Sequence, residues 1–366
     1  MKTRLITLLV CLLTISSINA SAQFGRPRTP GDTLTPVRIL ENGDAVFSIY
    51  APKARKVSLT GDIMPWGTQI KSFEKDGVWS FIVPKPEPGV YRYSYVVDGV
   101  KVIDPRSSLS LETTSIATIA PKGDEFFAKK NVPHGSVAQR FYYSSKFNTT
   151  RRMHIWTPAG YEKGKMKLPV LYLIHGGGDN DMSWSTAGAA GDILDNLMAE
   201  GKMQPCIVVM PNGSVPTMDF VDDLVDCIIP YIEDNYNVKT GSANRALAGL
   251  SMGGLETMET MLLHYDKFSY FWVMSAGWFE NDPKTMEVKA ARLKEIAADF
   301  NKKVKLCVFS QGGKSDIAYY NCLYTLKEGF DANGVKYEKY LNLEGDFGHS
   351  WTTWRSDINV LMPRLF

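Results

Sequence analysis

A serine flanked by glycines forms the strongest chemical motif of the chain. Gly249-Leu250-Ser251-Met252-Gly253 has the form G-x-S-x-G, and an apolar run, Arg245 to Leu250, leads into it. A sharp turn from strand to helix exposes such a serine, and the free N–H groups of the helix N-terminus favour a developing oxyanion. We therefore predict Ser251 as a nucleophile. The alternative is a glycine-rich packing turn.

A serine hydroxyl becomes a good nucleophile only when a base takes its proton. In this class of site the base follows the serine along the chain, and only His264 and His349 do so here. His264 falls inside the helix predicted after the motif, so we interpret it as structural. His349 falls in a turn between the last predicted strand and the last helix. The sequence therefore predicts His349 as the general base.

A carboxylate must hold the imidazole and stabilise its protonated form. Asp316 has the best placement, because it follows the predicted strand Val304 to Phe309 through a glycine-containing loop. Asp346 is the alternative. It lies only three residues before His349, where a role in the turn is expected instead.

Two backbone N–H groups are needed to hold the oxyanion. Met252, directly after the nucleophile, is expected to supply one. The other is expected from the loop His175-Gly176-Gly177-Gly178-Asp179, which follows the apolar run Val170 to Ile174. We favour Gly177 and keep Gly176 as the alternative. His175 is expected to orient this loop by hydrogen bonding rather than to transfer protons.

Trp184, shortly after this loop, is predicted to contact substrate together with Gly176. A buried packing role for the tryptophan is the alternative. The predicted reaction needs no cofactor, and we predict no metal, because the five histidines are scattered and no H-E-x-x-H pattern occurs. The cysteines after the N-terminal leader form no C-x-x-C pair, so we expect buried free thiols, with a disulfide as the alternative. These cysteines are Cys206, Cys227, Cys307 and Cys322.

The elements that must position these residues alternate between apolar strands and amphipathic helices. The predicted strands are Val170 to Ile174, Cys206 to Met210, Ala246 to Leu250, Tyr270 to Met274, Val304 to Phe309 and Tyr337 to Leu343. The predicted helices include Phe220 to Asn235, Met252 to Leu263, Thr285 to Phe300 and Ile317 to Phe330. This alternation predicts an α/β-hydrolase fold, a mostly parallel sheet with helices on both faces.

The segment before this region has a different sequence pattern. From about Thr35 to Ala120, short β-rich runs are broken by turn signals such as Asn42-Gly43 and Asp98-Gly99, which predicts a small β-sandwich of the immunoglobulin-like type. We divide the chain into a sandwich domain at 23–120, a polar linker at 121–137 and a catalytic domain at 138–366. A β-hairpin, Arg140 to Ser144 and Arg151 to Thr157, is expected to open the catalytic domain.

The first residues have the pattern of a signal peptide, 1–22. Lys2 and Arg4 precede an apolar run, Leu5 to Ile15, and the small residues Ala20-Ser21-Ala22 offer a cleavage site. The run is too short to span a bilayer, and Cys11 lies inside it, which disfavours lipid attachment. We predict export to the periplasm or outside the cell. The mature chain would carry as many Lys and Arg as Asp and Glu, so nucleic acid is not an expected partner.

Taken together, the motifs resemble carbohydrate esterase family 1, the feruloyl and acetylxylan esterases related to enterochelin esterases. The segments that carry the resemblance are Val132 to Val137, Tyr172 to Gly178, Ile229 to Glu233, Arg245 to Gly254 and Gly348 to Trp351. The resemblance implies a triad of Ser251, Asp316 and His349. It also implies that the partner is feruloylated or acetylated xylan, with feruloyl esters favoured over acetyl esters and a siderophore ester as the alternative. Acyl transfer to a sugar is a further alternative, because any alcohol can intercept the acyl-enzyme.

The first domain is similar to carbohydrate-binding module family 48 at Asp104-Pro105 and along the strand Tyr91 to Tyr95. Trp66, Trp79 and the tyrosines could form a platform on which sugars stack. We favour instead a structural cap that shapes the catalytic cleft. A hypothesis from another class, an inactive glycan-binding protein, is disfavoured by the intact serine, histidine and glycine loop. Oligomeric state is left open.

Overall fold

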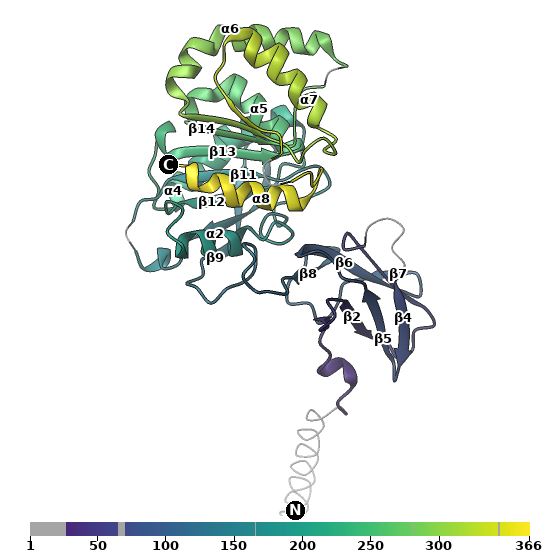
Figure 1. The fold of residues 1–366 in the computed structure, drawn as a ribbon. Coiled ribbons are helices and arrows are strands. Elements are labelled where there is room, and N and C mark those ends of the chain that lie inside the picture. Colours follow the sequence, from purple (N-terminus) through teal and green to yellow (C-terminus); the bar gives the residue numbers. More distant parts are fainter. Residues whose placement is uncertain (1–26, 65–69, 165, 280, 343–344) are drawn as a thin grey trace, which may run out of the picture.

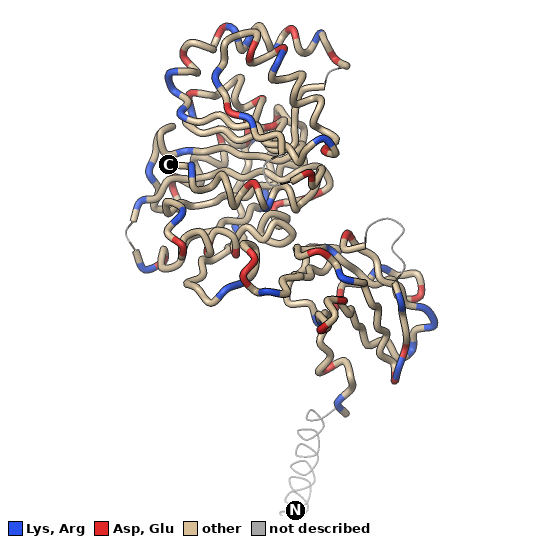
Figure 2. Tube along the Cα trace, in the orientation of Figure 1, with Lys and Arg blue, Asp and Glu red and all other residues tan. Residues whose placement is uncertain are grey.

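The computed structural model describes residues 27–64, 70–164, 166–279, 281–342 and 345–366 (Figure 1). The predicted signal peptide, 1–22, and Trp66 lie outside the described residues. Within the described ranges, no helix has the length and apolar character needed to cross a bilayer. The chain forms a sandwich domain followed by a larger α/β domain (Figure 1). Basic and acidic residues are interspersed along both domains (Figure 2).

The sandwich domain consists of two antiparallel sheets, as predicted. Its first sheet has the order β1 (Val37–Ile39), β2 (Ala45–Tyr50), β5 (Val78–Val83) and β4 (Lys71–Lys75). The second contains β3 (Val57–Gly61), β6 (Gly89–Val97), β7 (Val100–Val102) and β8 (Ser115–Ile119). Alternating side chains of these strands point inward, so two faces of mixed apolar and aromatic residues meet in one core.

Aromatic rings fill much of that core. Tyr93 and Tyr95 are fully buried, and their rings meet edge to face at 5.9 Å. The Tyr93 hydroxyl donates to Asp104 Oδ2 at 2.8 Å, which satisfies a polar group inside the sandwich. Trp79 is partly buried and donates its indole N–H to Ala51 O at 3.2 Å. These rings therefore stabilise the domain rather than forming an open platform for sugars.

The larger domain contains an eight-stranded sheet in the order β16-β15-β14-β13-β11-β12-β10-β9. The hairpin β9–β10 pairs antiparallel at one edge, while the strands from β11 to β16 are parallel. The strands are β9 (Ser136–Ser144), β10 (Thr149–Thr157), β11 (Val170–Ile174), β12 (Ile207–Pro211), β13 (Arg245–Leu250), β14 (Tyr270–Met274), β15 (Leu306–Ser310) and β16 (Glu338–Tyr340). The α/β-hydrolase prediction is confirmed.

The central strands read as continuous apolar runs because both faces of the sheet are covered. Along β11, Tyr172 and Ile174 enter one core cluster, while Leu171 and Leu173 enter the other. The first cluster lies under α3 (Thr217–Asp223), α4 (Ile229–Asn235), α5 (Met252–His264), α6 (Pro283–Lys303) and α7 (Tyr319–Tyr324). The second lies under α2 (Ala190–Ala199) and α8 (Trp351–Leu361) (Figure 1).

Three features differ from the sequence prediction. The helix predicted at Phe220 to Asn235 is continued through a π-helical segment, Leu224–Ile228. The last strand, predicted as Tyr337 to Leu343, is shorter, and Leu343 lies outside the described residues. The segment predicted as a polar linker is also packed onto the catalytic domain. Phe127 is buried there, and Asn196 Nδ2 donates to the carbonyls of Phe126 and Ala128 at 2.8 and 2.9 Å.

Candidate active site

Ser251 occupies a strained turn between β13 and α5. Its backbone angles are φ 52° and ψ −113°, a region that residues with side chains rarely adopt. Glycine is required on both sides. A Cβ on Gly249 would lie 2.1 Å from Gly253 O, and one on Gly253 would lie 2.6 Å from His175 O. The turn therefore brings strand, helix and glycine loop close together and leaves the serine hydroxyl at the surface of a cleft.

His349 and Asp316 converge on this serine from distant parts of the chain. His349 Nε2 lies 3.0 Å from Ser251 Oγ, and His349 Nδ1 lies 2.8 Å from Asp316 Oδ1. An ionised carboxylate only accepts hydrogen bonds, so Nδ1 carries the proton and Nε2 is free to take one from the serine. The structure thus brings together the three side chains predicted from the sequence, in the arrangement that general-base activation requires.

The Asp316 carboxylate is buried and fully engaged. Ser275 Oγ donates to Oδ2 at 2.6 Å, Gly312 N donates to Oδ2 at 3.1 Å, and Ala318 N donates to Oδ1 at 2.9 Å. Burial alone would raise the pKa of Asp316, but the hydrogen bonds from His349, Ser275 and the main chain outweigh it and leave the pKa lowered. The residue therefore stays ionised and oriented toward His349.

Neither alternative weighed from the sequence belongs to the triad. Asp346 accepts hydrogen bonds from the main-chain N–H and hydroxyl of Ser315, and thereby ties the loop that carries His349 to the loop that carries Asp316. Those hydrogen bonds lower the pKa of the exposed Asp346 carboxyl. His264 is the last residue of α5, at the opposite end of that helix from Ser251. Both outcomes agree with the sequence interpretation.

The glycine loop lies beside the nucleophile. Gly176, Gly177 and Gly178 line the same cleft as Ser251 and His349. A Cβ at Gly177 would meet no atom within 4 Å, so this residue faces open space, whereas one at Gly176 would lie 2.4 Å from Leu250 Cδ1. The assignment of the Met252 and Gly177 N–H groups to the oxyanion remains a prediction, and the placement of the loop is compatible with it.

His175 holds the start of this loop as a neutral imidazole. Gly213 N donates to His175 Nε2 at 3.0 Å, so the ring proton is on Nδ1, which lies 2.9 Å from the carbonyl of Gly176. Burial lowers the pKa of His175, which favours the same neutral form. The side chain therefore orients the loop through two hydrogen bonds.

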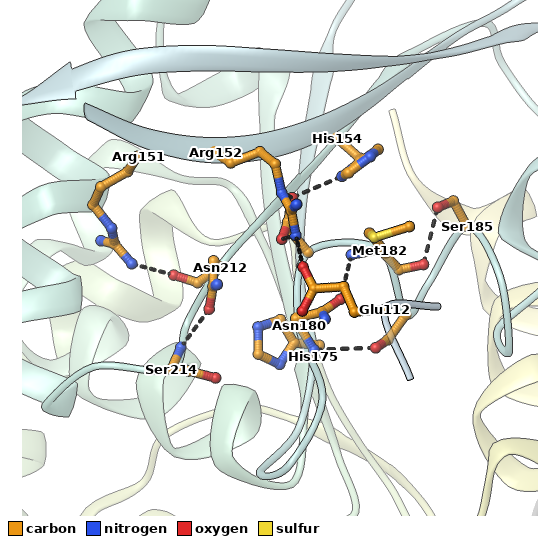
Figure 3. Close-up of polar contacts among 12 residues, drawn as sticks. Glu112, Arg151, Arg152, His154, His175, Asn180, Met182, Ser185, Asn212 and Ser214 are labelled. Atoms are coloured by element: carbon orange, nitrogen blue, oxygen red, sulfur yellow. Dashed lines mark hydrogen bonds and ion pairs between the residues drawn. The ribbon is translucent and has the colours of Figure 1, made fainter. Parts of the chain in front are cut away.

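Just beyond the loop, the buried carboxylate of Asp181 is held by side chains of β10, of which Arg152 and His154 are drawn in Figure 3. Arg152 donates to both oxygens of Asp181 at 2.8 Å, and His154 Nδ1 lies 2.7 Å from Asp181 Oδ2. Arg152 also donates to Glu112 Oε1 at 2.8 Å. Burial would raise the pKa of Asp181, but the contacts with His154 and Arg152 leave it lowered. Asp181 thus stays charged and ties the loop to the sheet.

The cleft above the nucleophile has a volume of about 510 Å³ and is shared by both domains. Its sandwich-domain lining consists of Asp62, Val90, Tyr91 and Arg92. Arg355, only 2% exposed, donates to the carbonyls of Val90 and Ala187 at 3.2 and 2.8 Å. Sequence reasoning missed Arg92 and Arg355, because nothing in the pattern of either domain indicates which of its surfaces meets the other.

The prediction that Trp184 contacts substrate is wrong. Trp184 is 1% exposed and does not belong to the lining of the cleft. Its indole N–H donates to Ile174 O at 3.1 Å, and its ring meets Trp351 edge to face at 5.0 Å. Both contacts draw the ring into the interior between β11 and α8. Gly176, predicted as its partner at the substrate, does line the cleft.

One group within the described residues has the composition of a metal site. Ligand atoms of His134, Asp192 and Asp195 all lie within 4.8 Å of one another. Asp195 already accepts hydrogen bonds from Gly135 N at 2.8 Å and contacts His134 Nδ1 at 2.9 Å, so the group fastens the segment before β9 to α2. None of the three lines the cleft of Ser251. The four described cysteines are buried free thiols, as predicted.

Comparisons with known proteins agree with this geometry. Residues 144–365 match the family described as putative esterase, and residues 34–108 match carbohydrate-binding module 48, the isoamylase N-terminal domain. An endo-1,4-beta-xylanase/feruloyl esterase of Xylanibacter ruminicola is 32% identical over 88% of this chain and 45% of the relative. Endo-1,4-beta-xylanase Y of Acetivibrio thermocellus is 30% identical over 48% of this chain and 17% of the relative. The matches thus span less than half the length of either relative.

Two solved structures share the fold. The feruloyl esterase module from Clostridium thermocellum, complexed with sinapinate, has a TM-score of 0.58 at 24% identity and covers 68% of this chain and 92% of that one. The enterobactin esterase from Shigella flexneri has a TM-score of 0.59 at 14% identity and covers 88% of this chain and 92% of that one. At these identities the likeness concerns the fold alone.

Proposed function

Because this chain belongs to the putative esterase family, we propose that it is a serine esterase that removes feruloyl groups from xylan, with acetyl groups as a second class of substrate. The observation that carries the proposal is the 3.0 Å contact between Ser251 Oγ and His349 Nε2, with Asp316 behind the imidazole. This arrangement can activate a hydroxyl at neutral pH without a cofactor or a metal ion.

The reaction follows from the geometry in two halves. His349 Nε2 takes the proton as Ser251 Oγ attacks the ester carbonyl, and the N–H groups of Met252 and Gly177 stabilise the resulting oxyanion. The protonated imidazole then gives its proton to the departing alcohol, which leaves an acyl-serine. Water enters and attacks the acyl carbonyl while His349 takes its proton. The bond between the acyl carbon and Ser251 Oγ then breaks, His349 returns the proton to Ser251 Oγ, and the acid is released. Asp316 holds the imidazole throughout and stabilises its charged form.

Two cavities of different character support an ester that joins an aromatic acid to a sugar. The cleft at Ser251 contains the charged side chains of Asp62, Arg92 and Asp179, which suit a hydroxyl-rich carbohydrate. A second cavity, about 310 Å³ in volume, is lined in part by Leu255, whose N–H donates to Ser251 O at 3.1 Å. Apolar side chains dominate its walls, and we assign the aryl group to it. These side chains are Met218, Leu255, Trp278, Phe279 and Met286.

The names of the relatives point to the same substrate. The Xylanibacter relative is named for both xylanase and feruloyl esterase activity, and the Clostridium module is a feruloyl esterase. A carbohydrate-binding module precedes the esterase region here. We accordingly propose feruloylated or acetylated xylan fragments as the physiological partner. Export after cleavage of the signal peptide is proposed with it, because such polymers lie outside the cell.

The proposal is tested by assaying the purified protein on methyl ferulate, on acetylated xylan and on a cyclic catecholate siderophore ester. We expect turnover of methyl ferulate to exceed that of the other two. Ser251→Ala should lower kcat by at least about 10⁴-fold, and a fluorophosphonate probe should label the wild type only. Ser72→Ala, an exposed serine on β4, is the matched control.

Turnover of the siderophore ester alone would refute the substrate class. Absence of both labelling and hydrolysis would refute the esterase itself and favour a glycan-binding protein. Adding xylo-oligosaccharide to the methyl ferulate reaction separates hydrolysis from acyl transfer, because a transferase forms feruloylated sugar instead of free ferulate.

A further inference from the structure

On the C-terminal side of its glycines, the loop is held by two different parts of the molecule. Just beyond the loop, Asp181 contacts Arg152 and His154, which project from β10 of the catalytic domain (Figure 3). The end of the loop at the cleft is Asp179, which directly follows Gly178. Asp179 turns back on the glycines, since its N–H donates to Gly176 O at 3.2 Å. The position of Asp179 therefore controls where the Gly176–Gly178 backbone points.

The cation that faces Asp179 comes from the sandwich domain. Arg92 Nη1 lies 3.0 Å from Asp179 Oδ1, although the two residues are far apart in sequence. The Asp179 side chain is 10% exposed and the Arg92 side chain 34%. Asp62 prepares Arg92 for this contact, because Asp62 accepts the Arg92 backbone N–H at 2.6 Å and Nε at 2.9 Å. The guanidinium is thereby oriented before it reaches across to the loop.

A buried carboxylate in this position would be harmful without its cation. Asp179 lines the cleft that contains Ser251, where negative charge develops on the substrate oxygen during the reaction. Burial raises the pKa of Asp179, and Arg92 acts in the opposite direction and favours the charged form. Removing the guanidinium alone would leave a poorly solvated carboxylate that repels the oxyanion and moves toward solvent, which would carry the glycines with it.

We propose that Arg92 is a positioning residue of the esterase reaction. Through Arg92, the sandwich domain holds the glycine loop in place and neutralises the carboxylate of Asp179. The inference rests on the proposed function, because it concerns the same site. It assigns the sandwich domain a part in the chemical step that is independent of any sugar it contacts. The competing explanation is that Arg92 binds the sugar part of the substrate directly, since its side chain also lines the cleft.

Small esters separate these explanations, because p-nitrophenyl acetate has no sugar for Arg92 to bind. On this ester and on methyl ferulate, we expect Arg92→Gln to lower kcat about 10-fold and to leave KM within about 2-fold, as loss of an interaction made in the transition state requires. Asp179→Asn should lower kcat only about 2- to 3-fold. The double variant should recover to about the level of Asp179→Asn, because without the carboxylate the guanidinium has nothing to neutralise.

Two further variants are matched to Arg92→Gln. Arg92→Lys keeps the charge but loses the fork of donors, and should lie between the wild type and Arg92→Gln. Arg38→Gln removes an exposed arginine from β1 of the same domain and should leave kcat unchanged. Thermal melting of each variant shows whether the fold is intact. An unfolded Arg92→Gln leaves Arg92→Lys and the double variant to carry the test.

The outcomes separate the inference from the function it rests on. A wild type that hydrolyses no ester refutes the proposed function. An active wild type refutes only the inference if Arg92→Gln retains full kcat on p-nitrophenyl acetate. The inference is also refuted if the double variant is no better than Arg92→Gln. A loss seen only as a higher KM on feruloylated xylan would assign Arg92 to sugar binding instead.

Discussion

The two walls of the catalytic cleft are built in different ways. The triad wall, made of Ser251, Asp316 and His349, is supported entirely from within the catalytic domain, and each polar atom of Asp316 has a short-range partner. The glycine-loop wall, Gly176 to Asp181, is supported on one side by β10 and on the other by Arg92 of the sandwich domain. Activation of the nucleophile thus belongs to one domain, whereas support of the glycine loop is shared by two.

This difference shows which parts of the site depend on contacts between the two domains. The triad requires only the parallel sheet, because loops at the carboxyl ends of neighbouring strands meet at one edge. The glycine loop also lies at that edge, but its Asp179 contacts Arg92 of the sandwich domain. Arg355 strengthens the same boundary by bonding to Val90 O and Ala187 O, and burial lowers its pKa to about 10. The sandwich domain is therefore part of the catalytic unit in structural terms.

The largest predicted effect is on the triad wall. Asp316→Asn should lower kcat by about 10⁴-fold on every ester, because an amide in place of the carboxylate favours the wrong tautomer of His349. The matched change, Asp346→Asn, removes an exposed carboxyl that does not contact the imidazole and should cost less than about 5-fold. The test is to measure the kcat of both variants on methyl ferulate under steady-state conditions. Equal losses for both variants would mean that Asp316 does not support the base.

A smaller effect is expected at the apolar cavity proposed for the aryl group, outside both walls. Phe279→Ala should raise KM for methyl ferulate about 5- to 10-fold, through the loss of roughly 1–1.5 kcal/mol of aromatic contact, and leave hydrolysis of p-nitrophenyl acetate unchanged. Phe279 is 56% exposed, so its removal should not disturb the core. Val288→Ala, an exposed apolar residue of α6 that does not line the cavity, is the control. An equal loss on both esters would place the aryl group elsewhere.

A third prediction concerns Glu256, on the helix that follows Ser251. This residue of α5 is fully buried, a Cβ on Gly213 would lie 2.6 Å from its Oε2, and neither carboxyl oxygen has a hydrogen-bond partner in the described chain. Burial raises the pKa of Glu256 well above its ordinary value of 4.5. The folded state therefore binds the proton more tightly than the unfolded state, and stability falls as the pH rises above that value.

Glu256→Gln should remove this dependence of stability on pH, because an amide does not titrate. We expect the variant to match the wild type in thermal stability at about pH 4 and to exceed it at pH 7, by about 1 kcal/mol in the free energy of unfolding. The activity should stay within about 2-fold, because a neutral side chain replaces a neutral side chain. Melting curves across this pH range test it. A variant that loses stability at pH 7 would show that the carboxyl is charged and paired.

The smallest effect should come from Glu112, which contacts the Arg152 side chain that holds Asp181 beside the glycine loop (Figure 3). Its side chain is 56% exposed, and it contacts an Arg152 guanidinium that Asp181 already holds by two hydrogen bonds. Exposed ion pairs contribute little, so Glu112→Gln should change kcat less than about 2-fold. Comparing the kcat of Glu112→Gln with that of Arg92→Gln shows whether an ion pair must be buried to affect catalysis. A loss as large as that of Arg92→Gln would contradict this ranking.

The residues predicted from the sequence are those whose role depends on local pattern. Ser251 is recognisable because glycine spacing and the change from strand to helix are both local features, and His349 because few histidines follow the serine. Trp184 was wrongly assigned, since a tryptophan near a functional loop has the same pattern whether its ring points into the cleft or the core. The packing of the linker around Phe127 was missed for a similar reason. Most residues of that segment are polar, and its composition does not show which of its few apolar side chains is buried.

By itself, the sequence determined the order of strands and helices, the strained serine turn and the chemistry of the triad. These features follow from periodicity and from the few residue types able to perform each step. Only the tertiary structure decided which surface of the sandwich meets the cleft, and hence that Arg92 faces Asp179 and Arg355 bonds to Val90. The physical reason is that contacts between domains join side chains with no shared periodicity, so their energy depends on a docking geometry that no local pattern encodes.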